Sequence, residues 1–178
     1  MIEPLPRNPN WPRYSLRPFP LYRYVPGQTW HPRRHPLGHS HGQPEPTPQL
    51  FSADRWETSD EYRHGIDLYN FAYWWESHEI FEEFWHASGR DSEQGNFFQA
   101  LIQLAAASLK QAMNNEAAAH KLVRAGIVRL QRVTAPYMGI DVPLLIPALH
   151  GYLAGRQPHL PLIRLRAGVG TVSGERQP

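Results

Sequence analysis

The placement of proline constrains this chain of 178 residues more than any other feature. Prolines are frequent in the first fifty residues and absent from Gln49 to Ala135. Because proline lacks a backbone N–H and restricts the residue before it, helices cannot run through the first segment. The sequence therefore predicts an extended arm over residues 1–50, a helical bundle domain over residues 51–155 and an extended C-terminal tail over residues 156–178.

Cap residues and stop signals divide the bundle region into helices. Thr58 and Glu61 form a capping-box pattern, which predicts a first helix that ends near residues 70–72. The further caps and stops are Gly89, Asp91 or Ser92, Asn114-Asn115, Pro136, Asp141 and Gly155. Short connections favour antiparallel neighbours, so the predicted fold class is all-α, a compact antiparallel bundle of about five helices.

Charge is unevenly divided along the chain, although the formal net charge is only +2. Residues 1–50 carry six Arg against two Glu, whereas residues 51–135 carry twelve acidic side chains against eight basic ones. This division predicts that the basic arm lies on its own acidic domain or on that of a partner subunit in a homodimer. Binding of single-stranded nucleic acid is disfavoured, because the net charge is low and the bundle is acidic.

The arm is richer in aromatic side chains than disordered linkers usually are. They are Trp11, Tyr14, Phe19, Tyr22, Tyr24 and Trp30. We therefore expect an ordered arm whose rings dock between the helices.

Cysteine is absent, which excludes a disulfide framework, a thiolate nucleophile and Cys-ligated zinc. No apolar run approaches the length that spans a bilayer, and prolines and arginines stand where a signal peptide has its hydrophobic segment. These features predict a cytoplasmic protein that does not enter a membrane.

Residues 74–85 contain four carboxylates and a histidine interspersed with large aromatic side chains. At about 100° per residue, His78 and Glu82 share a helical face with Phe81 and Trp85, and we expect this face to be buried. The remaining acids fall on the flank and far side: Glu76, Glu79 and Glu83. Burying a carboxylate costs several kcal/mol unless it is paired, hydrogen-bonded or bound to a metal, so this face predicts a structural polar network or a binding site.

Two motifs in this order resemble a known family. Residues 71–85 read Phe-Ala-Tyr-Trp-Trp-Glu-Ser-His-Glu-Ile-Phe-Glu-Glu-Phe-Trp, and residues 98–105 read Phe-Gln-Ala-Leu-Ile-Gln-Leu-Ala. Over roughly residues 60–135 the chain resembles the prokaryotic family of the domain of unknown function 309, and residues 26–40 look like the arm of a longer subgroup. The resemblance implies a small all-α bundle and no established activity. Ala100 stands where the family usually has Gly, and Lys110 where it tends to place a His.

A centre that binds a small ligand or an ion is one interpretation of these motifs. His78 and Glu82 are four residues apart, a spacing that lets two side chains of one helix bind the same metal ion. Gln99 and Gln103 have the same spacing and can donate to Glu82 or Glu79 across the helix interface. The candidate ligand-binding residues are Glu76, His78, Glu82, Glu83, Trp85, Gln99 and Gln103. A divalent metal is the cofactor considered, and the same residues also fit a purely structural network.

An enzyme is the second interpretation. A metal-dependent, hydrolase-like protein would use His78, Glu82 and Glu79 as catalytic groups, since a carboxylate on an aromatic face binds protons more tightly and histidine titrates near neutrality. No nucleophile with an adjacent base is recognisable. A homodimeric interaction protein is the third interpretation, because small bundles with exposed aromatic side chains often dimerise.

The arm contains the densest group of histidines, and imidazoles bind zinc, nickel or copper. The arm could also fold back and present His31 or His39 to the face that carries His78 and Glu82. The metal candidates are therefore His78, Glu82, His31, His35 and His39.

Overall fold

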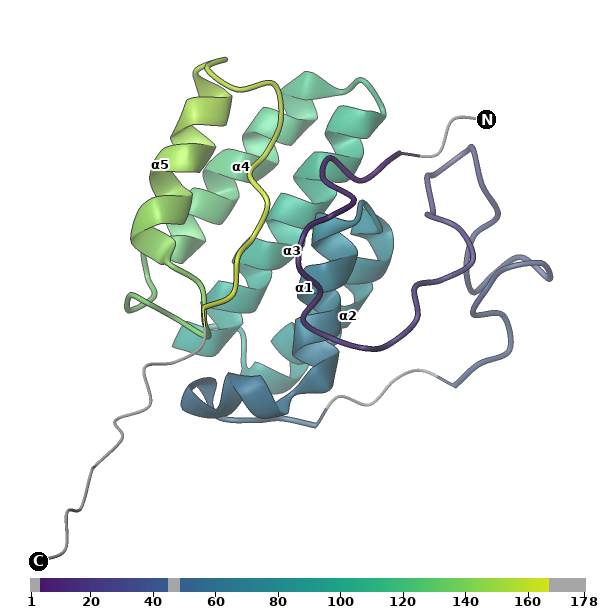
Figure 1. Ribbon diagram of the computed structural model, residues 1–178, viewed down its shortest axis with the longest axis horizontal. Helices are drawn as coiled ribbons and strands as arrows, with labels where there is room; N and C mark the ends of the chain where they lie inside the picture. The colour runs from purple at the N-terminus through teal and green to yellow at the C-terminus, as the bar shows by residue number, and fades with distance from the viewer. Residues whose placement is uncertain (1–3, 45–48, 167–178) are drawn as a thin grey trace, which may run out of the picture.

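The computed structural model describes residues 4–44 and 49–166. They form a bundle of helices with two extended segments lying along it (Figure 1). The helices are a 3₁₀ helix η1 (Ala53–Thr58), α1 (Asp60–Asn70), α2 (Trp74–Ser88), α3 (Glu93–Ala112), α4 (Glu116–Leu130) and α5 (Val142–Leu153). The all-α prediction is confirmed. Among these helices of the described ranges, none has both the length and the apolarity that crossing a lipid bilayer requires.

Local side-chain caps explain where the helices begin. Three predicted N-cap residues accept a hydrogen bond from the backbone N–H three residues ahead: Ser92, Asn115 and Asp141. The start of α1 differs from the prediction. Thr58 belongs to η1 and donates its hydroxyl to the carbonyl of Arg55 at 2.7 Å, whereas Ser59 Oγ accepts from the backbone N–H of Tyr62 at 3.2 Å. The prediction of Thr58 as the N-cap is therefore wrong by one residue.

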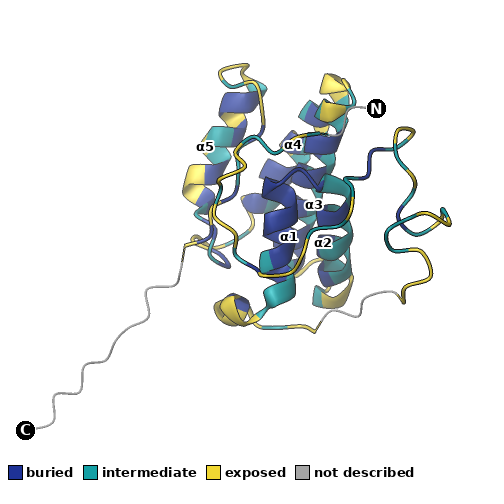
Figure 2. Ribbon diagram, turned by 45° about the vertical axis from the view of Figure 1, so that its right-hand side comes forward, coloured by how far each residue is buried: buried dark blue, intermediate teal, exposed yellow. Residues whose placement is uncertain are grey.

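The core lies where α3 packs between α2 and α4. Its largest members are rings with at most 1% exposure: Tyr62, Phe81, Phe84, Phe97 and Phe98. The rings of Phe84 and Phe98 stack with centroids 5.0 Å apart, which ties α2 to α3. Figure 2 shows the buried positions at the centre of the bundle and exposed ones on the outward side of α5.

A close contact between α1 and α2 fixes the rotation of α2. A Cβ atom at Gly65 would lie 2.8 Å from the ring of Phe81, so only glycine allows this approach. Ser77 Oγ donates to the carbonyl of Gly65 at 2.9 Å. Ser77, Phe81 and Phe84 consequently point into the core. His78 and Glu82 are left at the edge of the helix, and the prediction that they lie on its buried face is wrong.

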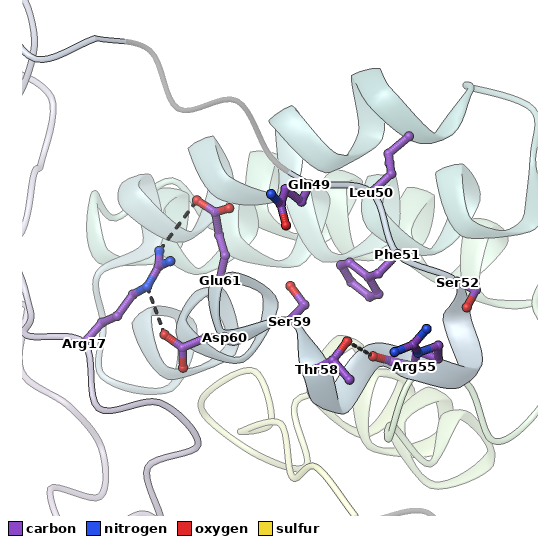
Figure 3. A pocket seen from close by; sticks show the side chains of 10 residues that line it. All are labelled: Arg17, Gln49, Leu50, Phe51, Ser52, Arg55, Thr58, Ser59, Asp60 and Glu61. Carbon is purple, nitrogen blue, oxygen red and sulfur yellow. Dashed lines mark hydrogen bonds and ion pairs between the residues drawn. The ribbon is translucent and has the colours of Figure 1, made fainter.

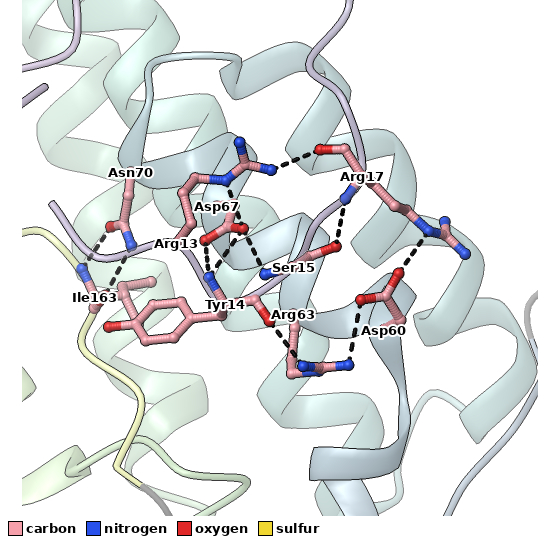
Figure 4. A network of polar contacts seen from close by, with 9 residues as sticks. All are labelled: Arg13, Tyr14, Ser15, Arg17, Asp60, Arg63, Asp67, Asn70 and Ile163. Atoms are coloured by element: carbon pink, nitrogen blue, oxygen red, sulfur yellow. Dashed lines mark hydrogen bonds and ion pairs between the residues drawn. The ribbon is translucent and has the colours of Figure 1, made fainter. Parts of the chain in front are cut away.

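Two polar side chains of α1 hold the extended segments (Figure 4). The buried carboxylate of Asp67 accepts from Arg13 Nε at 2.9 Å and from the backbone N–H groups of the next two arm residues, each at 2.9 Å. Asn70 exchanges two hydrogen bonds of 2.8 Å with the backbone of Ile163 in the C-terminal segment. Helix α1 therefore joins the arm and the C-terminal segment to the bundle.

Further arm arginines also bind the bundle of the same chain. Arg17 Nε donates to Asp60 at 3.0 Å, and its Nη1 lies 3.7 Å from Glu61. Arg23 Nε donates to the carbonyl of Phe71 at 2.9 Å. The positive charge of the arm thus lies against acidic side chains and carbonyl groups at both ends of α1.

The arm also covers His64 of α1, whose ring stacks on Phe19 with centroids 6.2 Å apart. Burial, with the nearby charges of Arg17 and Arg13, lowers the pKa of His64 to about 4. In the unfolded chain the pKa of histidine is about 6.5, so the unfolded state binds the proton more tightly. The neutral ring therefore contributes its full stability above about pH 6.5, and this contribution is lost as the pH falls toward 4.

We expect the free energy of unfolding to fall by up to about 3 kcal/mol over this pH range because of His64 alone. The measurement is urea unfolding at a series of pH values for the wild type and for His64→Leu. The variant should lack this part of the pH dependence. Identical pH profiles for the two proteins would contradict the assignment.

Candidate functional site

Three side chains in the middle of α2 form a compact group. His78 Nδ1 lies 3.5 Å from Glu79 Oε1 and 4.0 Å from Glu82 Oε2. One ligand atom of each residue lies within 4.8 Å of the others, and no second group of three such residues forms within residues 4–44 and 49–166. The side chains of His78, Glu79 and Glu82 are 23%, 39% and 40% exposed. The group is therefore open to solvent.

The histidine of this group has an unused nitrogen. His78 Nδ1 is itself buried and has no hydrogen-bond partner in the described structure. The indole of Trp75 stacks on the imidazole with centroids 5.8 Å apart, which holds the ring in place. Because an unprotonated imidazole nitrogen offers a lone pair, Nδ1 and the two adjacent carboxylates form a donor set for a cation.

The arm forms one wall beside this group. The ring of His31 packs edge-on against Trp75 with centroids 5.6 Å apart, so Trp75 contacts both His31 and His78. His31 Nδ1 accepts from the backbone N–H of Arg34 at 3.4 Å. Burial lowers the pKa of His31, Arg34 acts in the same direction, and Glu79 opposes them. His31 is thus close enough to respond to the charge of Glu79, while its Nδ1 is occupied by the backbone of the arm.

Glu76 is a buried carboxylate, whereas the helical periodicity of the sequence predicted that it lies outside the buried face of the helix. It is 7% exposed because the arm covers it. Its Oε1 accepts from the backbone N–H of Tyr24 at 3.0 Å and lies 3.1 Å from His39 Nε2. The arm therefore brings His39 to Glu76 and not to His78 and Glu82. Glu76 holds the arm in place.

The other arm histidines bind within the arm itself. The ring of His35 stacks on Trp30 with centroids 5.4 Å apart, and its Nδ1 accepts from the backbone N–H of Leu37 at 3.1 Å. His41 Nδ1 lies 3.0 Å from the carbonyl oxygen of Arg33. These contacts shape the loop, and the described residues of the arm do not bring three metal-type ligands together.

The two glutamines of α3 do not pair with the acids of α2. Within the described ranges, no hydrogen bond joins Gln99 or Gln103 to Glu79 or Glu82, and the buried Oε1 of Gln103 has no partner. The contact of Phe84 with Phe98 sets an antiparallel register that places Gln103 near the level of His78. The two glutamines therefore do not complete a hydrogen-bonded network with the acids of α2.

The remaining predicted residues lie further along α2. Glu83 is half-buried. The indole of Trp85 has a buried, unpartnered Nε1, and the guanidinium of Arg90 lies 5.0 Å from its ring centroid. The ring of Trp85 therefore meets the guanidinium of Arg90 near the C-terminal end of α2.

Asp67 and Asn70 are positioning residues that the sequence patterns did not predict. Both lie in a run of α1 that is otherwise apolar or aromatic, beside Ile66 and Tyr69, and both are at most 1% exposed. A polar pair within such a run was the available signal. Their partners lie 54 and 93 residues away in sequence, so no local pattern identifies them.

A cleft of about 510 Å³ opens at the N-terminal end of α1 (Figure 3). Arg17 pairs with Asp60 and Glu61 at one end, and Thr58 binds Arg55 at the other. The acids of this cleft are thus already paired with the arm. His78 follows the opposite end of α1, so the cleft does not contain the candidate ligands.

Comparison with known proteins gives a family match to the helical domain. A search of curated proteins found no match. The model of the domain of unknown function DUF309 matches residues 62–122, from the first turn of α1 into α4. The match contains both sequence motifs and the group formed by His78, Glu79 and Glu82. The match over residues 62–122 confirms the resemblance to the family of the domain of unknown function 309 that the two motifs predicted.

Proposed function

We propose that this protein binds a divalent metal ion through His78 Nδ1 and the carboxylates of Glu79 and Glu82. The observation that carries the proposal is the convergence of an unpartnered imidazole nitrogen and two carboxylates within 4.8 Å. One imidazole with carboxylates suits zinc, iron or manganese. Two ligands of a tetrahedral zinc lie about 3.3 Å apart, and His78 Nδ1 and Glu79 Oε1 are 3.5 Å apart. Small side-chain rotations would complete the coordination.

The exposure of the group favours an exchangeable ion over a sealed structural one. All three donors come from one helix, so the opposite side of the ion would remain open to water or to a small ligand. The stacked indole of Trp75 reduces the motion of the imidazole, which lowers the entropy that binding would cost.

Metal titration by calorimetry tests the proposal. Metal-free protein would be titrated with Zn²⁺ and with Mn²⁺, for the wild type and for His78→Ala. We expect the variant to bind about 100-fold more weakly, a loss of about 2.7 kcal/mol, because one of three ligands is removed. The double variant Glu79→Gln, Glu82→Gln keeps the side-chain shapes and should lose binding to the same extent or more.

His86→Ala is the matched control, since His86 is an exposed histidine in the last turn of the same helix. Its affinity for the metal should equal that of the wild type. An unchanged affinity in His78→Ala, or an equal loss in His86→Ala, would refute the proposed site.

A further inference from the structure

Charge is polarised across the helical domain. Residues 117–166 contain seven Lys and Arg residues and a single acid, Asp141. The basic residues are Lys121, Arg124, Arg129, Arg132, Arg156, Arg164 and Arg166. Helix α5 contains no acidic residue at all. Helix α4 carries Lys121, Arg124 and Arg129 against Glu116 at its first position, whereas α5 carries neither Lys nor Arg. The positive charge of this half of the domain therefore lies on α4 and on the segments that follow the two helices, in contrast to the acidic α2.

A groove of about 530 Å³ lies between α4 and α5. One wall consists of residues at helical spacing from α4 and its C-cap: Arg124, Ile127, Val128 and Gln131. The other wall consists of residues at the same spacing from α5 and its C-cap: His150, Leu153 and Ala154. Aliphatic side chains thus line the interior of the groove, and Arg124, Gln131 and His150 supply its polar groups. Val128 is 50% exposed, so apolar surface faces solvent here.

The contacts of the arm leave this groove open. In the described part of the chain, the arm's hydrogen bonds to the helices go to α1, α2 and α3. Arg124 is exposed, and no carboxylate of the described residues pairs with it. An unpaired cation beside exposed aliphatic side chains is a surface that complements an acidic and apolar ligand.

We propose that the groove between α4 and α5 docks an amphipathic helix of a partner protein, with aliphatic residues on one face and acidic residues along its flanks. Helices bind such grooves through apolar side chains at i, i+3, i+4 and i+7. The wall from Arg124 to Gln131 covers eight residues and rises by about 10 Å, which matches about two turns of a bound helix. Single-stranded nucleic acid fits less well, because the lining contains no Phe, Tyr or Trp ring on which bases would stack.

Fluorescence anisotropy with a designed peptide tests this docking surface. The probe is a labelled helical peptide of four turns, with leucines along one face and glutamates on both flanks, and its control peptide has lysines in place of the glutamates. The full chain with EDTA present should bind the acidic peptide at least tenfold more tightly than the basic one. Arg124→Glu should weaken binding of the acidic peptide at least tenfold.

The control variant is Arg90→Glu, which reverses the charge at an exposed position beyond the end of α2. This variant should bind the acidic peptide as tightly as the wild type does. Arg124 and Val128 are exposed, so Arg124→Glu and Val128→Asp should fold normally by circular dichroism. Val128→Asp should also weaken binding, because it places a charge on the apolar lining.

Several outcomes would overturn this inference. The acidic peptide could fail to bind, or both peptides could bind equally. An oligothymidylate that binds more tightly than the acidic peptide, with the affinity lost in Arg124→Glu, would assign the surface to nucleic acid. Sedimentation that shows a wild-type dimer dissociated by Arg124→Glu would show that a second copy of this chain fills the groove.

Discussion

Replacing Asp67 by alanine should lower the free energy of unfolding by about 3–5 kcal/mol. The substitution leaves the guanidinium of Arg13 without its carboxylate and removes the acceptor of two backbone N–H groups, those of Tyr14 and Ser15. The carboxylate is fully buried, so water does not replace these bonds while the arm stays docked. Urea unfolding near neutral pH measures the loss.

The control for this prediction is Asp60→Ala on the same helix. Asp60 also pairs with arm residue Arg17, but its side chain is 42% exposed. Its loss should cost less than about 1 kcal/mol, since solvent screens the pair. Faster hydrogen exchange at the amides of Tyr14 and Ser15 in Asp67→Ala would locate the effect in the arm. Equal losses in the two variants would contradict the special role of Asp67.

Replacing Asn70 by alanine should cost about 2–4 kcal/mol of unfolding free energy, the second largest effect that we expect. Asn70 donates to the carbonyl of Ile163 and accepts from its N–H, each at 2.8 Å. Both backbone groups are buried, and alanine offers them no partner. The measurement is urea unfolding, together with hydrogen exchange at the amide of Ile163, whose protection should fall.

Asn115→Ala provides the comparison for Asn70. Asn115 caps α4 at an exposed position with one hydrogen bond to a backbone N–H, so its loss should cost about 1 kcal/mol. The amide of Ile163 should remain protected in this variant. If Asn70→Ala unfolds with the free energy of the wild type, the pairing of α1 with the C-terminal segment contributes nothing to stability.

The helix boundaries could be predicted from the sequence because their causes are local. A cap such as Ser92 or Asp141 acts on an N–H three residues away, and Gly89 ends α2 with a positive φ of 82°. Thr58 was misassigned because two hydroxyl residues adjoin and η1 occupies the first of them. Local rules do not indicate which of the two hydroxyl residues belongs to η1 and which one caps α1.

The candidate site was only partly predictable for a different reason. The spacing of His78 and Glu82 correctly indicated that they lie close together on α2. Which face of α2 is buried depends on the contact between Gly65 and Phe81, and the burial of Glu76 depends on the arm. Each contact joins two different elements of the fold, so the helical periodicity of α2 alone does not indicate it.

Anomalous X-ray diffraction of crystals soaked in zinc tests the proposed cation site at His78, Glu79 and Glu82. We expect a peak about 2.0–2.2 Å from His78 Nδ1 and from carboxylate oxygens of Glu79 and Glu82. An empty position beside His78, with zinc bound at the arm histidines or nowhere on the protein, would refute the proposed site.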